Sequence, residues 1–141
     1  MDTPPPTWEA EIWDMINSAW ERMCPSQRKL WEAIRVDPVR WQQHPYGTSE
    51  GGFWVVGIYG GKVLWFNHIE LGFNRSRWTT PGKLDEYWCN QDDLEWTVQY
   101  VMNEIADGYD SSGYCGPPQS LPLTTPKQGG GANSAALRDS P

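Results

Sequence analysis

The spacing of hydrophobic residues changes from a helical period to a strand period near residues 51–52. Before that point, apolar residues recur every three or four positions, which predicts one helix ahead of Pro25 and a second helix after it. We expect Thr7 to cap the first helix and Ser26 to cap the second. The buried positions predicted for these helices are Ile12, Ile16, Ala19, Trp20, Met23, Leu30, Trp31 and Ile34.

Two apolar stretches, 53–59 and 62–67, are separated by Gly60-Gly61, a residue pair suited to a tight hairpin turn. A two-residue turn at this point fixes which residues of the two strands face each other. Both faces of the resulting hairpin are apolar, so we expect other elements to cover both faces. The predicted pairs are Val56 with Trp65, Val55 with Phe66, Ile58 with Val63, and Gly57 with Leu64.

The pattern becomes polar beyond Gly72, which predicts a third strand at 73–78 with one face exposed to solvent. A turn at Pro81-Gly82 then allows residues 84–89 to return as a fourth strand. Residues 38–45, which begin and end with proline, are expected to form a loop.

A last helix is predicted to begin after Asn90, which is suited to cap it, with Asp93 as a partial capping-box partner. Gly108 is suited to the left-handed conformation that ends many helices. The predicted buried positions of this helix are Leu94, Val98, Val101 and Ile105.

Together these elements predict an α+β fold with two N-terminal helices, a four-stranded antiparallel meander and a C-terminal helix packed on the sheet. The chain has 141 residues, enough for one domain, which we expect to span 7–109 after a flexible lead-in at 1–6. Gly, Pro and Ser make up 15 of the residues from 110 to 141, which predicts a disordered tail. Tyr109, Tyr114, Leu121 and Leu123 are candidates to tether its first half to the domain.

The chain contains ten tryptophans and carries a formal net charge of −7. A core of this size does not need ten tryptophans, so we expect some at the surface, where Trp often contacts a partner. The negative charge opposes binding to nucleic acid and favours either a basic partner or a solvated surface with no partner. Three widely separated cysteines, no secretion signal in 1–6 and no long apolar run together predict a cytoplasmic protein without a membrane partner.

Candidate metal and catalytic groups are few. Two histidines without a repeated His or Cys spacing predict no metal and no cofactor, although His68 and Glu70 with a remote ligand form an alternative. Cys89 as a nucleophile with His68 as its base is the clearest catalytic arrangement, set against an ordinary buried cysteine. The acidic pairs Asp85-Glu86 and Asp92-Asp93 do not have the geometry expected of a catalytic pair.

Recognition of a partner protein accounts for more residues than catalysis does. We therefore predict a non-enzymatic interaction module for a basic protein partner, in an oligomeric state that the sequence leaves open. Its acidic contacts would be Asp92, Asp93 and Glu95, and its apolar anchors would be Trp54 or Trp78.

Two alternatives remain beside this prediction. The first is a small enzyme or ligand-binding domain with a pocket near Glu70, Arg75, Arg77 and Cys89. The second is single-strand nucleic-acid binding through Arg75, Arg77 and Trp78, set against pairing of the two arginines with Glu70 and Glu86.

Two segments carry a resemblance to known proteins: Asn67-His68-Ile69-Glu70-Leu71-Gly72-Phe73-Asn74-Arg75-Ser76 and, after Gly82, Glu86-Tyr87-Trp88-Cys89-Asn90-Gln91-Asp92. Over residues 20–106 the chain resembles a group of small bacterial proteins without an assigned activity, and this resemblance implies no catalytic or binding residue. In size, acidity and tryptophan content the chain is also similar to bacterial immunity proteins, which neutralise toxins by binding them. That second likeness implies an inhibitor or immunity-type function.

Overall fold

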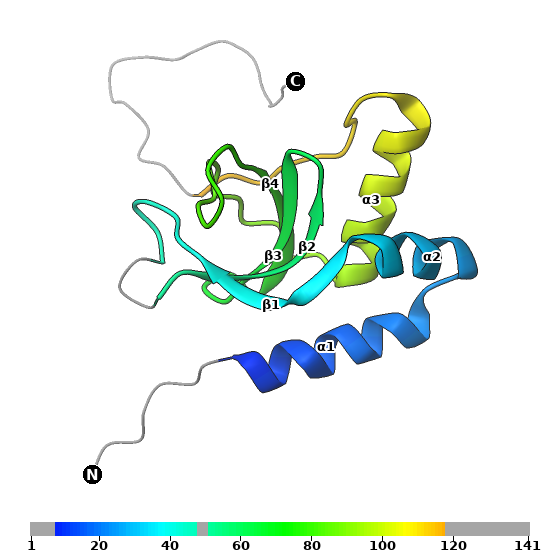
Figure 1. Ribbon diagram of the computed structural model, residues 1–141, viewed down its shortest axis with the longest axis horizontal. Coiled ribbons are helices and arrows are strands. Elements are labelled where there is room, and N and C mark those ends of the chain that lie inside the picture. The colour runs from blue at the N-terminus through cyan, green and yellow to red at the C-terminus, as the bar shows by residue number, and fades with distance from the viewer. Residues whose placement is uncertain (1–7, 48–50, 118–141) are drawn as a thin grey trace.

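The computed structural model describes residues 8–47 and 51–117 (Figure 1). The strands form one antiparallel sheet in the order β1-β2-β3-β4, and the helices pack on one side of it. This arrangement confirms the α+β class, the four-stranded antiparallel meander and the C-terminal helix packed on the sheet. The elements are α1 (Glu9–Arg22), α2 (Pro25–Ile34), β1 (Arg35–Trp41), β2 (Phe53–Tyr59), β3 (Lys62–Asn67), β4 (Gly72–Arg77) and α3 (Leu94–Asp107).

The fourth strand of the sheet is β1, at a place where the sequence predicted a loop. Val39 of β1 pairs with Val55, whereas residues 84–89 form no strand. The loop predicted at 38–45 is therefore wrong over 38–41, which belong to β1, and the strand predicted at 84–89 is wrong. Pro38 is tolerated because β1 is an edge strand, where the missing N–H faces no neighbour, and because the register shifts between Arg35 and Val39.

The face of the sheet that carries the helices buries the larger core. The expected spacing in α1 and α2 is confirmed, because the following residues are buried: Ile12, Ile16, Ala19, Met23, Trp31 and Ile34. Trp20 and Leu30 are half-buried at its edge. In α3, Val98 and Val101 are fully buried, but Ile105 is 50% exposed. Since Ile105 lies on the same helix face as Val101, the last turn of α3 extends past the core.

The hairpin of β2 and β3 has the expected register only near its turn. Ile58 pairs with Val63 and Gly57 pairs with Leu64, as predicted. A bulge between Val55 and Gly57 then shifts the pairing, so the predicted partners of Val55 and Val56 are wrong. The bulge lies where β2 passes α2: a Cβ atom on Gly57 would lie 3.3 Å from the Trp31 ring.

This bulge changes which face each side chain joins, because one extra residue inverts the alternation of a strand. Val55 pairs with Trp65 and packs with it on the face away from the helices. Val56 instead packs with Phe66 in the core beneath the helices. The sequence had instead predicted Val56 together with Trp65 and Val55 together with Phe66.

The face away from the helices carries a second, aromatic core. Its buried residues are Trp41, Phe53, Val55, Val63, Trp65 and Leu84. Tyr46 and Tyr87 cover it from two different segments, and their rings stack with centroids 3.9 Å apart. Both faces of the hairpin are therefore covered, as the sequence predicted.

The helix termini differ from the predictions at two points. Thr7 lies outside the described residues, and α2 is capped by Cys24, whose N–H donates to Gln27 Oε1 at 2.8 Å, rather than by Ser26. The N-cap of α3 is Asp93, not Asn90. Gly108 has φ 84° at the end of α3, as expected for a C-terminal glycine.

Candidate functional site

Strand β4 is buried along most of its length, which corrects the prediction of a strand with one exposed face. Asn74 and Ser76 are 2% and 1% exposed. Ser76 Oγ accepts a hydrogen bond from Trp65 Nε1 at 2.8 Å and donates to the Glu86 carbonyl at 2.9 Å. Asn74 exchanges two hydrogen bonds with the backbone of Asn90, at 3.0 and 2.8 Å. These polar side chains therefore attach residues 86–90 to the sheet instead of contacting solvent.

Arg75 points from β4 toward the helices and is only 2% exposed. Its Nη1 donates to Asp110 Oδ2 at 2.7 Å. The guanidinium carbon lies 4.9 and 4.4 Å from the ring centroids of Tyr100 and Tyr114. Nη2 has no hydrogen-bond partner among the described residues, so the two rings are its nearest favourable contacts.

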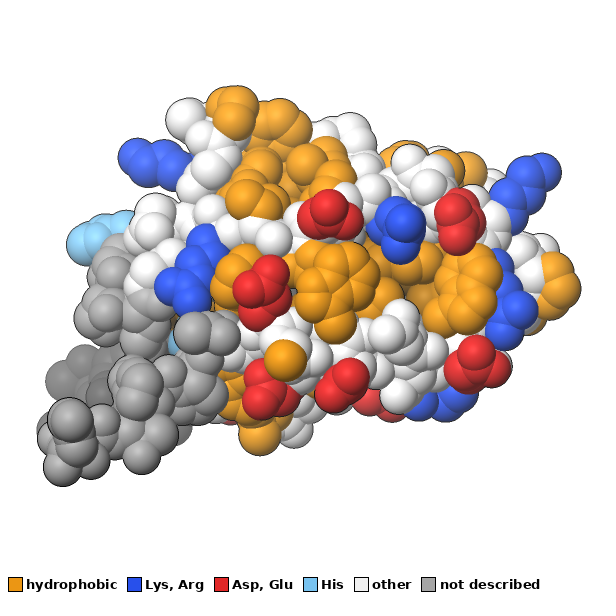
Figure 2. Space-filling view, turned by 60° about the horizontal axis from the view of Figure 1, so that its bottom comes forward, with side chains coloured by type: hydrophobic (Ala, Val, Ile, Leu, Met, Phe, Trp, Pro, Cys, Tyr) orange, Lys and Arg blue, Asp and Glu red, His pale blue; other side chains and the backbone are white. Residues whose placement is uncertain are grey.

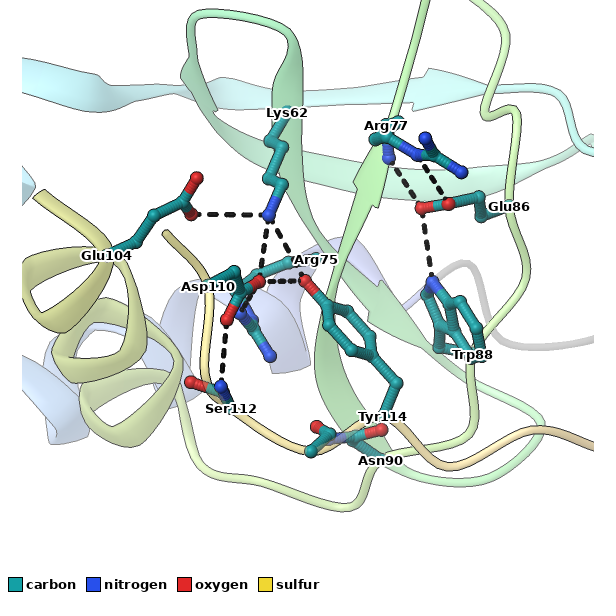
Figure 3. A network of polar contacts seen from close by, with 11 residues as sticks. Lys62, Arg75, Arg77, Glu86, Trp88, Asn90, Glu104, Asp110, Ser112 and Tyr114 are labelled. Atoms are coloured by element: carbon teal, nitrogen blue, oxygen red, sulfur yellow. Dashed lines mark hydrogen bonds and ion pairs between the residues drawn. The ribbon is translucent and has the colours of Figure 1, made fainter. Parts of the chain in front are cut away.

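Three donors converge on Asp110 Oδ2 (Figure 3). Besides Arg75, these are Lys62 Nζ at 2.8 Å and the Tyr114 hydroxyl. Burial opposes ionisation of Asp110, but the charge of Arg75 and the hydrogen bonds from Lys62 and Tyr114 hold its pKa well below the usual range. Burial and the same carboxylate raise the pKa of Tyr114 to about 12. Glu104 Oε1 also lies 3.2 Å from Lys62 Nζ, so at neutral pH the cluster combines two cations, two carboxylates and a neutral phenol.

This cluster joins the segment after α3 to the sheet. Cys115 N–H donates to Asn90 Oδ1 at 2.7 Å, and Asn90 Nδ2 donates to the Gly113 carbonyl at 3.0 Å. The sequence placed residues 110–117 in a disordered tail, whereas the structure packs them against the domain. The remainder of that predicted tail, 118–141, lies outside the described residues.

Residues of the predicted alternative pocket are engaged separately. Arg77, at the exposed end of β4, contacts Glu86 Oε2 through Nε at 2.6 Å, as the pairing alternative proposed. Arg75 is paired with Asp110 on the face of the sheet that carries the helices. Glu70 follows β3, and its backbone carbonyl accepts from Gln91 Nε2 at 2.9 Å. The structure does not join the two arginines to Cys89.

The Cys89 thiol has the properties of a packed side chain. It is 8% exposed, and burial raises its pKa, which is opposite to the shift of an activated nucleophile. The helix predicted to begin next to it starts only at Leu94. His68, the base paired with it in the sequence prediction, packs its ring 5.1 Å from that of Phe53.

The predicted apolar anchors are both half-buried. Trp54 lies at the edge of the helical core, and Arg40 lies 4.8 Å above its ring. Trp78 packs edge-on against Trp41 and donates from Nε1 to the Gly60 carbonyl at 3.0 Å. Each ring therefore contacts the domain and keeps a solvent-facing part.

The predicted acidic contacts also differ. Glu95 is 8% exposed and binds Arg22 through both carboxylate oxygens, at 2.6 and 3.0 Å. Burial opposes ionisation of Glu95, but the Arg22 hydrogen bonds lower its pKa. Asp92 is half-buried and accepts from Asn90 Nδ2 at 3.1 Å. Asp93 is exposed and makes no side-chain hydrogen bond that caps α3, but its charge, after that of Glu95, helps to raise the pKa of Arg22.

A cavity of about 220 Å³ lies beside Asp93, between α1 and the start of α3. Asp14 of α1 also lines this cavity, so two carboxylates from distant parts of the sequence meet there. No sequence motif joins them: Asp14 appears only as a polar position on a helix whose other side is buried. The complete lining is Asp14, Met15, Ser18, Arg22, Phe73, Asp93 and Leu94.

The outer surface of α1 is acidic and partly aromatic. Trp13 and Trp20 are half-buried and pack against the edge of the helical core. Figure 2, which brings the α1 side forward, shows hydrophobic side chains bordered by both acidic and basic ones on this face. The exposed acids that α1 supplies are Glu9, Glu11, Asp14 and Glu21.

Comparison with known proteins found no matching family model, no matching curated protein and no matching solved structure. The resemblances drawn from the sequence therefore stay predictions. Within residues 8–47 and 51–117, no helix has the length and hydrophobicity required to cross a bilayer. The same residues include no group of three His, Cys, Asp or Glu side chains positioned to hold a metal ion.

Proposed function

We propose that this protein is a non-enzymatic, cytoplasmic interaction module that binds a basic partner, such as a bacterial inhibitor or immunity-type protein. The observation that carries the proposal is the outer surface of α1, which bears four exposed carboxylates and the half-buried Trp13 and Trp20, with Arg28 lying 4.8 Å from the Trp20 ring (Figure 2). Acidic groups raise the association rate with a basic protein, and tryptophan supplies large contact area.

The charge balance of α1 supports this choice of surface. Its four acids face solvent, whereas its one basic residue, Arg22, is bound by both oxygens of Glu95. The acidic charge of the α1 surface is therefore largely uncompensated by the helix itself. Asp93 extends the same acidic surface across the cavity to α3.

The proposal also changes which residues should contact the partner. Asp93, Trp54 and Trp78 stay as contacts because each has a solvent-facing part. Glu95 becomes a supporting residue, since Arg22 already engages its carboxylate. The enzyme alternative has less support, because the Cys89 thiol is buried and its pKa is raised.

The test begins with selection of basic peptides from a displayed library against the full chain. Affinity for the best peptide is then measured for Glu9→Gln/Glu11→Gln/Glu21→Gln, which neutralises the α1 surface. The matched control, Glu32→Gln/Asp37→Asn/Asp85→Asn, removes the same charge from exposed acids elsewhere. We expect the α1 variant to weaken binding about tenfold more than the control, most strongly at low salt.

Two results would contradict the proposal. Failure of the library to yield any basic peptide that binds the folded chain would remove its basis. Equal weakening in the α1 variant and the control would show that net charge, and not this surface, attracts the peptide.

A further inference from the structure

The cavity between α1 and α3 combines groups that suit one kind of ligand. Its two exposed acidic residues are Asp14 of α1 and Asp93, the N-cap of α3, and the charge of Asp93 also acts on Arg22. Arg22 also lines the cavity, but Glu95 binds its guanidinium at 2.6 and 3.0 Å. The remaining charge at the cavity is therefore negative.

The N-terminus of α3 adds a partial positive charge beside this cavity, which by itself would favour an anion. Asp93 is the N-cap residue, so its carboxylate offsets that charge. Asp14 then remains as a second acid without a matching cation. An anionic ligand would have to approach both carboxylates, which makes a cation the favoured occupant.

The deeper part of the cavity is apolar. Phe73 and Leu94 are 2% and 1% exposed, so they form its base, and the half-buried Met15 lies beside them. A ligand that fits this lining has an aliphatic stem that contacts the base and a charged end that reaches the carboxylates. Lysine and arginine side chains have this construction.

We infer that this cavity receives the side chain of a lysine or arginine residue from the basic partner. The inference rests on the proposed function and specifies how the partner is held. The methylene stem packs on Phe73 and Leu94, and the cationic end lies between Asp14 and Asp93. Burial of one long side chain in a fitted cavity supplies an anchor of the kind that dominates many protein interfaces.

The first experiment tests the cavity without any partner protein. The full, isotope-labelled chain is titrated with the Nα-acetyl methylamides of lysine, arginine and norleucine, and backbone amide shifts are recorded. Norleucine supplies the aliphatic stem without the charge. We expect lysine or arginine amide, but not norleucine amide, to shift Ser18, Phe73 and Leu94, and the stronger of the two identifies the preferred cation.

The matched variants separate this cavity from general attraction by an acidic protein. Asp14→Asn/Asp93→Asn should abolish those shifts, and it keeps an asparagine that is suited to cap α3. Asp37→Asn/Asp85→Asn removes the same charge from other exposed positions and should retain the shifts. Equal shifts with norleucine amide, or equal loss in both variants, would overturn the inference.

The second experiment distinguishes failure of this inference from failure of the proposed function. Each basic residue of a selected peptide is replaced in turn by norleucine, and affinity is measured for wild type and Asp14→Asn/Asp93→Asn. At one peptide position we expect the effects of the norleucine replacement and of Asp14→Asn/Asp93→Asn not to be additive. There the replacement should weaken binding to the variant about tenfold less than it weakens binding to wild type. Strong peptide binding with additive effects at every position would overturn the inference while the proposed function stands. If no peptide binds, the proposed function fails, and the inference fails with it.

Discussion

Arg75 and Asp110 are joined by a contact of 2.7 Å between Nη1 and Oδ2, although 35 residues separate them in the sequence. Arg75 is 2% exposed and lies in the middle of β4, whereas Asp110 follows the end of α3. The pair therefore attaches the segment after the last helix to the centre of the sheet (Figure 3). Lys62 reaches the same oxygen at 2.8 Å and also contacts Glu104 Oε1 at 3.2 Å, so two carboxylates compensate the two cations.

Removing the charge of Asp110 should destabilise the domain. We expect Asp110→Asn to lower the free energy of unfolding by about 2–4 kcal/mol, because a buried Arg75 is left without its counter-charge. Urea denaturation followed by tryptophan fluorescence measures this change. Asp107→Asn, at an exposed position near the end of α3, should change stability by less than about 0.5 kcal/mol. Similar losses in both variants would show that the cluster does not hold the segment.

The same cluster predicts how stability changes at acid pH. The pKa of Asp110 lies below its ordinary value of 3.8, and the pKa of Glu95 lies below 4.5. Each carboxylate therefore contributes stability that is complete above those ordinary values and is lost as the pH falls through its lowered pKa. Denaturation at several pH values between about 5 and 2 should show a smaller loss of stability for Asp110→Asn than for wild type. Parallel curves would contradict this assignment.

At alkaline pH two half-buried tyrosines, Tyr87 and Tyr114, act in the opposite direction. Burial raises the pKa of Tyr114 and of Tyr87 to about 12, from an ordinary value of 10. Their contribution to stability is complete below pH 10 and is lost as the pH rises toward 12. When tyrosinate formation is followed by ultraviolet absorbance, Tyr114→Phe should show one fewer tyrosine that ionises late in the alkaline titration. Tyr109→Phe, at a residue 65% exposed, should leave the late titration unchanged.

Thiol reactivity separates the packing and catalytic interpretations of Cys89. All three cysteines are free, and Cys24 and Cys115 are exposed whereas Cys89 is buried. We expect a disulfide reagent to modify Cys24 and Cys115 rapidly in the folded protein and Cys89 only after denaturation. The variant Cys24→Ser/Cys115→Ser isolates the remaining thiol for measurement. Rapid reaction of Cys89 in that variant, especially below neutral pH, would restore the enzyme alternative.

Local patterns predicted much of the fold because they depend on neighbours in the sequence. The helical spacing that places Ile16 and Ala19 in the core is confirmed. The Gly60-Gly61 turn and the strand pairs beside it are confirmed as well. The bulge at Val56 could not be predicted in the same way. It arises where Gly57 meets Trp31 of α2, a contact between residues far apart in the chain.

Long-range polar contacts explain the other differences. The sequence Asn74-Arg75-Ser76 indicates an exposed strand only if these side chains lack partners within the protein. Asn90 and Asp110 supply two of those partners, and neither contact follows from spacing along the chain. The cavity lined by Asp14 and Asp93 was missed for the same reason, since the packing of α1 against α3 brings the two acids to one site.

A substitution at Gly72 would test how closely the segment after β4 packs against the sheet. A Cβ atom at this position would lie 2.3 Å from Gln91 Cα and 2.4 Å from the Asn90 carbonyl oxygen, both backbone atoms. Because that backbone is held by Asn74, it cannot move away without breaking the Asn74–Asn90 hydrogen bonds. We therefore expect Gly72→Ala to lower the free energy of unfolding by about 2–4 kcal/mol.

Gly61→Ala is the matched control, because a Cβ atom there meets no atom within 4 Å. It should change stability by less than about 1 kcal/mol in the same urea titration. The amide resonances of Asn90 and Gln91 should also shift in Gly72→Ala but not in Gly61→Ala. If Gly72→Ala were as stable as wild type, residues 90–91 would have to lie farther from β4 than the hydrogen bonds of Asn74 require, and the attachment of this segment to the sheet would be wrong.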